Sequence, residues 1–258
     1  EPLSGQTEER SSVLQNERNV RAMTEFYYTL SETKLEQSVI GGVSTEKILE
    51  AAKGIIEKNE GTYGSVNAND NGALSIGKMQ WHAYRAARLL QAIISADNQQ
   101  AYAILGDTLY TEIVKLSTTD NKVWSNRTLT SDEKSRISSL LQTNSGKAIQ
   151  DKLEASDISG YINRAYAIGL RNASAVVYYT DIENQWGSGG AARQVEYAEN
   201  IAGSREKITL NEMHLGALCY SRSYNPRRLQ TYGLVIALQW PDCPPKDQEI
   251  PYDRPWSD

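Results

Sequence analysis

Two carboxylic acids and a hydroxyl lie close together in the sequence, in an order that could support acid–base chemistry. Glu60 is expected where a helix ends, and a carboxyl there meets the negative end of the helix dipole. That field favours the protonated carboxyl, the form that a general acid needs, and partial burial would act in the same direction. Asp70 lies in a turn rich in Gly and Asn, so we expect it to stay solvated and ionised. It could hold a water molecule or stabilise positive charge, and the Ser75 hydroxyl could position the same water.

The elements that must position these residues are a helix, a glycine-rich β-element and a second helix. The first helix can be capped by Ser44 or Thr45, and apolar residues recur on one face up to Ile56. Glycines at 61, 64, 72 and 77, interleaved with asparagines, predict tight turns because both residue types tolerate positive φ. The alternation over 73–76 predicts a short strand, and helical spacing resumes over 82–96.

The stretch from Asn59 to His82 resembles the active-site region of the lysozyme-like glycoside hydrolases, including phage-type lysozymes. Glu60-Gly61, then Asp70, then Ser75-Ile76-Gly77 follow the phage-type order of Glu-Gly, Asp and Thr-Ile-Gly, with Ser keeping the hydroxyl of Thr. The segment 77–80, Gly-Lys-Met-Gln, is similar to a Gly-Leu-Met-Gln segment of lytic transglycosylases. The resemblance implies a mainly α, lysozyme-like (α+β) fold with many helices and one small β-hairpin at the active-site cleft.

The resemblance also implies an activity, the cleavage of β-1,4 glycosidic bonds. Glu60 would be the general acid, and Asp70 and Ser75 would position the attacking water. We expect bacterial peptidoglycan as the substrate and a secreted or cell-wall-associated enzyme. Action on chitosan or chitin, lytic transglycosylation, and a non-catalytic wall-binding or assembly role stay open. If water attacks opposite Glu60, the enzyme is inverting and its two carboxyls stand roughly 6.5–9.5 Å apart.

Further polar residues are candidates for binding the polysaccharide. Tyr63, Asn69 and Gln80 lie in the glycine-rich stretch, Asp181 lies near the end of an apolar helix beside Glu183, and Tyr224-Asn225 is similar to a Tyr-Asn pair near the cleft of transglycosylases. Two of these candidates have a structural alternative: an exposed helix-end acid for Asp181 and a proline turn for Tyr224-Asn225. For Asp70 the alternative is an Asx-turn or a calcium site.

Composition excludes several other classes of function. The net charge of −5 provides no basic surface for nucleic acid, and no apolar run is long enough to span a bilayer. The two histidines are far apart and neither cysteine lies in a CxxC motif, so we expect no metal site and no cofactor. The 15 Tyr and 5 Trp suit carbohydrate contact as well as ordinary half-buried positions. We expect a monomer.

The pattern along the chain predicts three regions: an N-terminal helical extension over 1–42, a catalytic domain over 43–240 and a proline-rich tail over 241–258. Capping-box signals at Thr130 and Thr209 predict helix starts. Other helices are expected over 99–116, 145–154, 157–170, 173–185 and 227–240. A disulfide between Cys219 and Cys243 would hold the tail, and the alternative is a buried thiol at Cys219.

Overall fold

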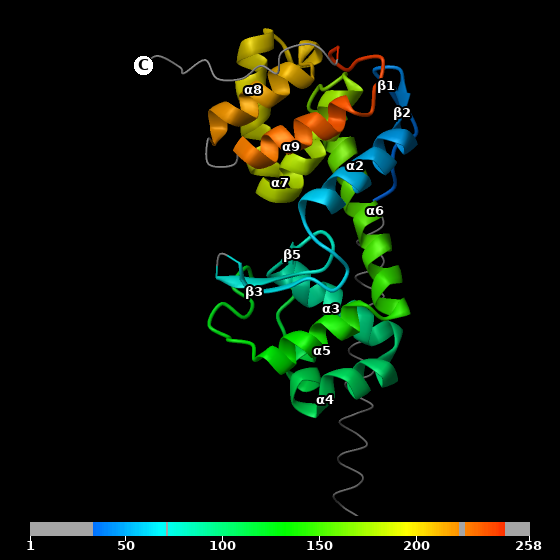
Figure 1. The fold of residues 1–258 in the computed structure, drawn as a ribbon, viewed down its shortest axis with the longest axis vertical. Helices are drawn as coiled ribbons and strands as arrows, with labels where there is room; N and C mark the ends of the chain where they lie inside the picture. The colour runs from blue at the N-terminus through cyan, green and yellow to red at the C-terminus, as the bar shows by residue number, and fades with distance from the viewer. Residues whose placement is uncertain (1–32, 71, 222–224, 246–258) are drawn as a thin grey trace, which may run out of the picture. The chain divides into compact units, whose positions relative to one another are not determined.

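The computed structural model describes residues 33–70, 72–221 and 225–245. Over these ranges the chain is mainly helical with short antiparallel strands (Figure 1), which is the α+β class predicted. It divides into two compact units. We call Glu60–Glu154 the hairpin unit, and Thr33–Asn59 with the chain from Ala155 onward the helical unit. The chain passes from one to the other after Asn59 and again inside one helix.

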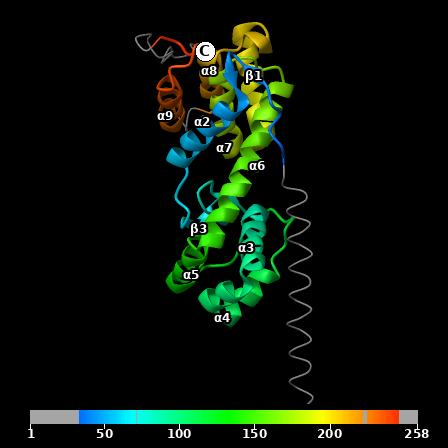
Figure 2. The ribbon, with the colours of Figure 1, turned by 90° about the vertical axis from the view of Figure 1, so that its right-hand side faces the viewer.

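The hairpin unit contains the three-stranded sheet and the helices that cover it. In chain order its elements are β3 (Val66–Asp70), β4 (Ala73–Ile76), β5 (Trp81–His82), α3 (Tyr84–Ala96), α4 (Asn98–Val114) and α5 (Ser131–Leu141). Strand β4 is buried along its whole length and lies between β3 and β5. Helix α3 packs on β4 and β5, and α5 contacts β3 and α4. Figure 2 shows α3, α4 and α5 next to one another. The sheet is therefore held by helices that follow it in sequence.

The helical unit is built around one long helix. Its elements are β1 (Val39–Ile40), β2 (Val43–Ser44), α2 (Thr45–Asn59), α7 (Ala173–Ala202), the 3-10 turn η1 (Arg205–Lys207), α8 (Leu210–Tyr220) and α9 (Asn225–Ile236). Helix α7 contacts α2, α8 and α9, and its first turns are completely buried. At Gly216 of α8, a Cβ atom would lie 2.6 Å from the Gln194 carbonyl oxygen of α7, so only glycine allows this close approach.

Helix starts agree best with the sequence predictions. Both capping boxes are present, at Thr130 before α5 and at Thr209 before α8. Helix α2 ends at Asn59, so Glu60 follows its last residue, as predicted. The apolar face of α2 is buried at Ile48, Ala52, Ile55 and Ile56. Local signals of this kind are read well from sequence because the residues that form them are neighbours in the chain.

Two helices are longer than predicted. Residues 145–154 and 157–170, expected as separate helices, lie in one continuous helix, α6 (Asn144–Ala167). Buried side chains continue at helical spacing on both sides of residues 155–157, at Ile149, Leu153, Ile158 and Ile162. Helix α7 was expected to end before Gly187. The backbone does leave helical geometry there (φ 68°, ψ 175°), but it resumes and continues to Ala202 because that part packs against α8.

Of the two alternatives left open for Cys219 and Cys243, the structure has no disulfide between them. The Cys243 sulfur lies 3.0 Å from the Ser174 hydroxyl instead. The start of the tail is held by Asp242, which accepts hydrogen bonds from the Ala173 amide and, at 2.6 Å, from the Ser174 hydroxyl. The N-terminal helical extension expected over 1–42 lies outside the described residues as far as residue 32, and β1 follows at Val39–Ile40. None of the described helices is both long and apolar enough to cross a membrane.

Candidate active site

Strand pairing brings two of the polar side chains of the hairpin unit to the same face of the sheet. Strands β4 and β5 are antiparallel, and Ser75 is directly opposite His82. Residues opposite each other in an antiparallel pair project their side chains to the same side. Strand β3 pairs with β4 through a register irregularity between Asn67 and Asp70. Bulges of this kind re-aim side chains, and here the Asp70 carboxylate reaches Ser75.

Asp70, Ser75 and His82 form a chain of hydrogen bonds. The Ser75 hydroxyl donates to Asp70 Oδ2 at 2.7 Å, and His82 Nδ1 lies 3.0 Å from the same hydroxyl oxygen. A serine hydroxyl has one proton, and Asp70 accepts it, so His82 Nδ1 must carry the proton of the second bond. The Ser75 side chain is therefore fixed from both sides, and it fixes the rotation of the carboxylate.

The side chains of Asp70, Ser75 and His82 differ in how accessible they are to solvent. The side chains of Asp70 and His82 are 38% and 41% exposed, whereas Ser75 is 0% exposed. Solvent can reach the carboxylate and the imidazole but not the hydroxyl between them. The predicted role of Ser75 as a direct ligand of the water is therefore corrected: its hydroxyl lies behind Asp70 and can act on a water only by orienting that carboxylate.

Glu60 lies at the other end of the same sequence stretch and is half-buried. The backbone turns sharply after it, because the Thr62 amide donates to the Ser65 hydroxyl at 2.9 Å. A Cβ atom on Gly61 would lie 2.7 Å from that hydroxyl oxygen, so a larger residue there would have to displace the Ser65 side chain. Glu60, Asp70, Ser75 and His82 all belong to the hairpin unit.

The other predicted binding residues of this unit differ in how accessible their polar groups are. The Tyr63 hydroxyl donates to Asp151 Oδ1 at 2.6 Å, and this bond, helped by burial, raises the pKa of Tyr63. Gln80 donates its side-chain amide to the Gly77 carbonyl at 3.0 Å, within its own turn. Both side chains are thus used inside the fold. Asn69 is exposed on β3.

Asp181, predicted to bind substrate, lies in the helical unit and is completely buried. Its carboxylate accepts hydrogen bonds from Arg227 at 2.7 Å and from Arg228 at 2.9 Å. Asn59 and Thr231 donate to it as well, at 3.1 and 2.8 Å. Burial alone would raise its pKa, but the two arginines hold the pKa of Asp181 below its usual value. A carboxylate so enclosed neutralises the arginines and does not face a ligand, which corrects the prediction.

The structure gives little information about two of the predicted substrate-binding residues. Tyr224 lies outside the described residues, and Asn225 is the first residue of α9. Among the described residues, no group of three or more His, Cys, Asp or Glu side chains could hold a metal ion.

Sequence reasoning missed His82. A signal was available, because Ser75 and His82 flank a short Gly-containing turn that can pair them across two strands. The pairing depends on where β5 begins, and a strand of two residues leaves almost no periodicity to detect.

Comparisons with known proteins bear on the fold. No protein-family model matches the sequence, and no curated protein matches it. The structure is similar to that of a mutant chitosanase from Bacillus subtilis MY002 complexed with 6 GlcN. The TM-score is 0.50 at 18% sequence identity, over 72% of this chain and 80% of that chain. The chain therefore has the α-rich fold with a small antiparallel sheet that this chitosanase has, which confirms the lysozyme-like fold class predicted from the stretch around Glu60.

Proposed function

We propose that this protein is a glycoside hydrolase that cleaves β-1,4 bonds of an amino-sugar polymer, with peptidoglycan as the leading substrate. The observation that carries the proposal is the Asp70–Ser75–His82 chain, in which a solvent-accessible carboxylate is held rigidly on a hairpin that follows a helix-end glutamate. The chitosanase-like fold supports the same class of reaction. Action on peptidoglycan would place the enzyme at the cell wall.

Glu60 is the proposed general acid. Cleavage needs a proton on the leaving glycosidic oxygen while positive charge develops at the anomeric carbon. Glu60 is half-buried and directly follows the last residue of α2, and we assign it the role of proton donor.

Asp70 is the proposed base for the attacking water. Its exposed carboxylate can accept a water proton, and a fixed orientation lowers the entropic cost of aligning that water with the sugar. Ser75 and His82 are positioning residues that hold Asp70 from behind. Attack opposite Glu60 would invert the configuration at the anomeric carbon.

Chitosan is the second candidate substrate, because the similar solved structure is a chitosanase complexed with 6 GlcN. Lytic transglycosylation on this fold would form a 1,6-anhydro end and would not use Asp70 as a base. A non-catalytic wall-binding protein would leave every polymer intact.

The test is digestion of purified peptidoglycan, chitin oligomers and chitosan by the wild-type chain and by Glu60→Gln. Product ends are identified by mass spectrometry, and the anomer formed first is identified by NMR. The amide keeps the shape of the glutamate but cannot donate the proton, so a loss of roughly a hundredfold or more is expected. Circular dichroism should show an unchanged fold.

Two outcomes would contradict the proposal. A folded Glu60→Gln variant with near-wild-type turnover would exclude Glu60 as the acid. Wild-type protein that cleaves none of the three polymers would exclude the hydrolase. A β anomer or an anhydro end would remove the role of Asp70 while keeping that of Glu60.

A further inference from the structure

A polar pocket of about 350 Å³ lies beside the strand that carries Asp70. One wall is β3, with Asn67 and Asn69. The other wall is the segment 125–129 together with Lys134 from the first turn of α5. All of these residues belong to the hairpin unit. The pocket is therefore built on the same strand as the candidate base, by a part of the chain to which the proposed reaction assigns no role.

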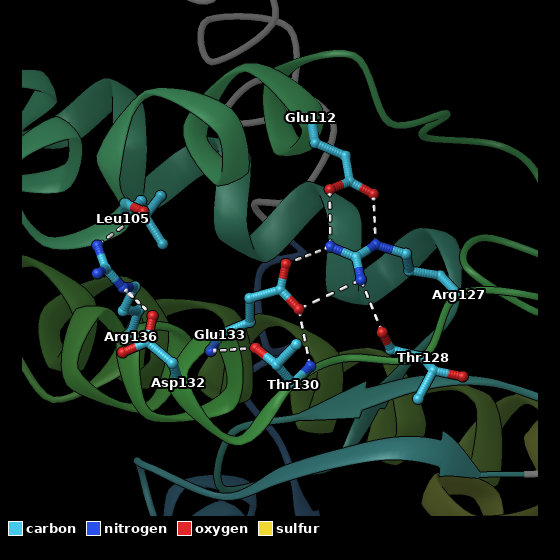
Figure 3. A network of polar contacts seen from close by, with 8 residues as sticks. All are labelled: Leu105, Glu112, Arg127, Thr128, Thr130, Asp132, Glu133 and Arg136. Atoms are coloured by element: carbon cyan, nitrogen blue, oxygen red, sulfur yellow. Dashed lines mark hydrogen bonds and ion pairs between the residues drawn. The ribbon is translucent and has the colours of Figure 1, made fainter.

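The wall formed by residues 125–129 is held in place by Arg127. Arg127 donates through Nε to Glu112 at 2.8 Å and through its other nitrogens to Glu133 and to the Thr128 carbonyl at 2.7 Å (Figure 3). These carboxylates raise the pKa of Arg127, so the guanidinium stays charged. Glu133 is also the capping-box residue of α5. A charged, multiply bonded clamp of this kind fixes a loop that has no regular secondary structure.

Apolar anchors complete that clamp. Val123, two residues before the segment, and Leu129, its last residue, are each 4% exposed. Between them the side chains of Ser125, Asn126 and Thr128 are exposed. Because Val123 and Leu129 are buried and Arg127 between them is held by ion pairs, these polar groups keep fixed positions opposite β3. A preorganised wall binds a ligand without a large ordering cost.

The chemistry of the lining is dominated by hydrogen-bond donors. Asn67 Oδ1 accepts from the Asn69 amide at 3.3 Å, and Asn69 Oδ1 accepts from the Gly72 amide at 3.2 Å. Both oxygens are thus turned to the backbone. Over the part of the chain that the structure describes, neither Nδ2 group has a hydrogen-bond acceptor, and Lys134 is exposed and in no ion pair.

The pocket contains no carboxylate to balance a ligand cation. Its lining has two basic residues, Arg127 and Lys134, and no acidic one. Glu112 and Glu133, which lie outside the lining, are bonded to Arg127. A protonated sugar amine would meet the like charges of Arg127 and Lys134, whereas a carbonyl or carboxylate oxygen would meet amide and ammonium donors.

We propose that this pocket is a glycan subsite for an N-acylated sugar, held through the oxygen of its acetamido group or of a neighbouring carboxylate, and that it rejects glucosamine with a free amine. The inference rests on the proposed function, which supplies an amino-sugar polymer as the substrate. It narrows that substrate to acetylated glycans, such as peptidoglycan or chitin, in preference to chitosan. Acetamido and carboxylate oxygens share the acceptor chemistry that the pocket requires.

The test is a binding measurement on the full chain carrying Glu60→Gln, which keeps the oligosaccharides intact. The three probes are the hexamer of N-acetylglucosamine, the hexamer of glucosamine and a peptide-free peptidoglycan strand with its lactyl carboxylates. We expect Kd at least roughly tenfold lower for both acetylated probes than for glucosamine hexamer. Tighter binding of the peptidoglycan strand than of the chitin hexamer would identify the carboxylate as a ligand, and equal binding would identify the acetamido group alone.

Two variants test the pocket itself against a matched control. Asn69→Asp keeps the oxygen that accepts from the Gly72 amide but replaces the outward donor with a carboxylate oxygen. Lys134→Glu reverses the charge, and Lys122→Glu makes the same charge change at an exposed position outside the lining. We expect Asn69→Asp and Lys134→Glu each to weaken binding of the acetylated probes by roughly tenfold, and Lys122→Glu to leave it unchanged.

The pocket proposal is overturned if glucosamine hexamer binds as tightly as the acetylated probes, if none of the three binds, or if Lys134→Glu behaves like Lys122→Glu. These results do not depend on turnover. Cleavage by a wild-type enzyme whose pocket variants bind normally would remove the subsite and keep the hydrolase. Acetylated probes that bind in the pocket but are never cleaved would support the subsite and contradict the proposed hydrolase.

Discussion

The two units each contain an aspartate in a polar cluster, and the two clusters are built in opposite ways. Asp70 is 38% exposed and is held by Ser75, five residues away. Asp181 is 0% exposed and accepts from Asn59, 122 residues away, and from arginines 46 and 47 residues away. The first cluster leaves its carboxylate accessible to water, whereas the second uses its carboxylate to hold α2, α7 and α9 together.

The difference between the two clusters shows which surroundings a carboxylate needs for catalysis and which it needs for stability. A reactive carboxylate must contact solvent and keep one orientation, which a short hairpin provides through local bonds. A buried carboxylate must be fully paired, because an uncompensated charge in the interior costs several kcal/mol. The same residue type therefore serves chemistry in one unit and stability in the other.

The largest effect that separates the two clusters is expected for Asp181→Asn. The substitution keeps the shape but removes the charge that balances Arg228, which is 1% exposed. We expect the free energy of unfolding to fall by about 3–5 kcal/mol, as it does when one partner of a buried ion pair is removed. Urea denaturation followed by circular dichroism measures this change in the free energy of unfolding.

The matched control is Asp70→Asn, which should change the free energy of unfolding by less than about 1 kcal/mol, since its carboxylate is partly solvated. Equal destabilisation by the two variants would break the comparison.

The same Asp70→Asn variant should show the opposite pattern in activity. We expect kcat on the polymer identified as substrate to fall by roughly a hundredfold or more, because the amide cannot accept the water proton. KM should change little, since the defect lies in the water and not in the sugar contacts.

Variants of Ser75 test whether the hydrogen bond that orients Asp70 contributes to kcat. Ser75→Ala removes the bond that orients Asp70 and should lower kcat less than Asp70→Asn, by roughly tenfold. Ser75→Thr keeps the hydroxyl and should restore part of the loss, provided that the added methyl fits the buried site. An alanine variant with normal kcat would show that the hydrogen bond to Asp70 has no role in positioning.

A further difference between the units is a dependence of stability on pH that originates in the helical unit. His214 is completely buried in the helical unit, where its Nδ1 lies 2.7 Å from the Tyr178 hydroxyl and Tyr232 lies against its ring. Burial, together with the charge of Arg228, lowers the pKa of His214 to about 4 from 6.5. Below pH 6.5 the unfolded chain therefore binds a proton that the folded chain cannot, so stability falls as pH decreases from 6.5 towards 4. At pH 5 the loss should be about 2 kcal/mol relative to pH 7.

Denaturation of His214→Gln at the two pH values provides the check. This variant cannot take up the proton, so its stability should fall by about 2 kcal/mol less than that of the wild type between pH 7 and pH 5. An identical decrease in both proteins would show that His214 is not the group responsible.

The sequence by itself determined the features that depend on neighbouring residues. The capping boxes at Thr130 and Thr209, the end of α2 at Asn59 and the strand over 73–76 all follow from local rules, and the structure has each of them. The order of Glu60, Asp70 and Ser75 likewise indicated the lysozyme-like fold class. The assignment of catalytic roles to these residues stays a prediction.

Only the tertiary structure decided which polar groups face solvent and which are used inside the fold. Ser75 could be recognised as close to Asp70, but its complete burial and its bond to His82 depend on the pairing of β4 with β5. Asp181 looked like a helix-end acid until α2 and α9 brought Asn59 and two arginines to it. Burial and pairing depend on residues far apart in sequence, and helical or strand spacing contains no information about such partners.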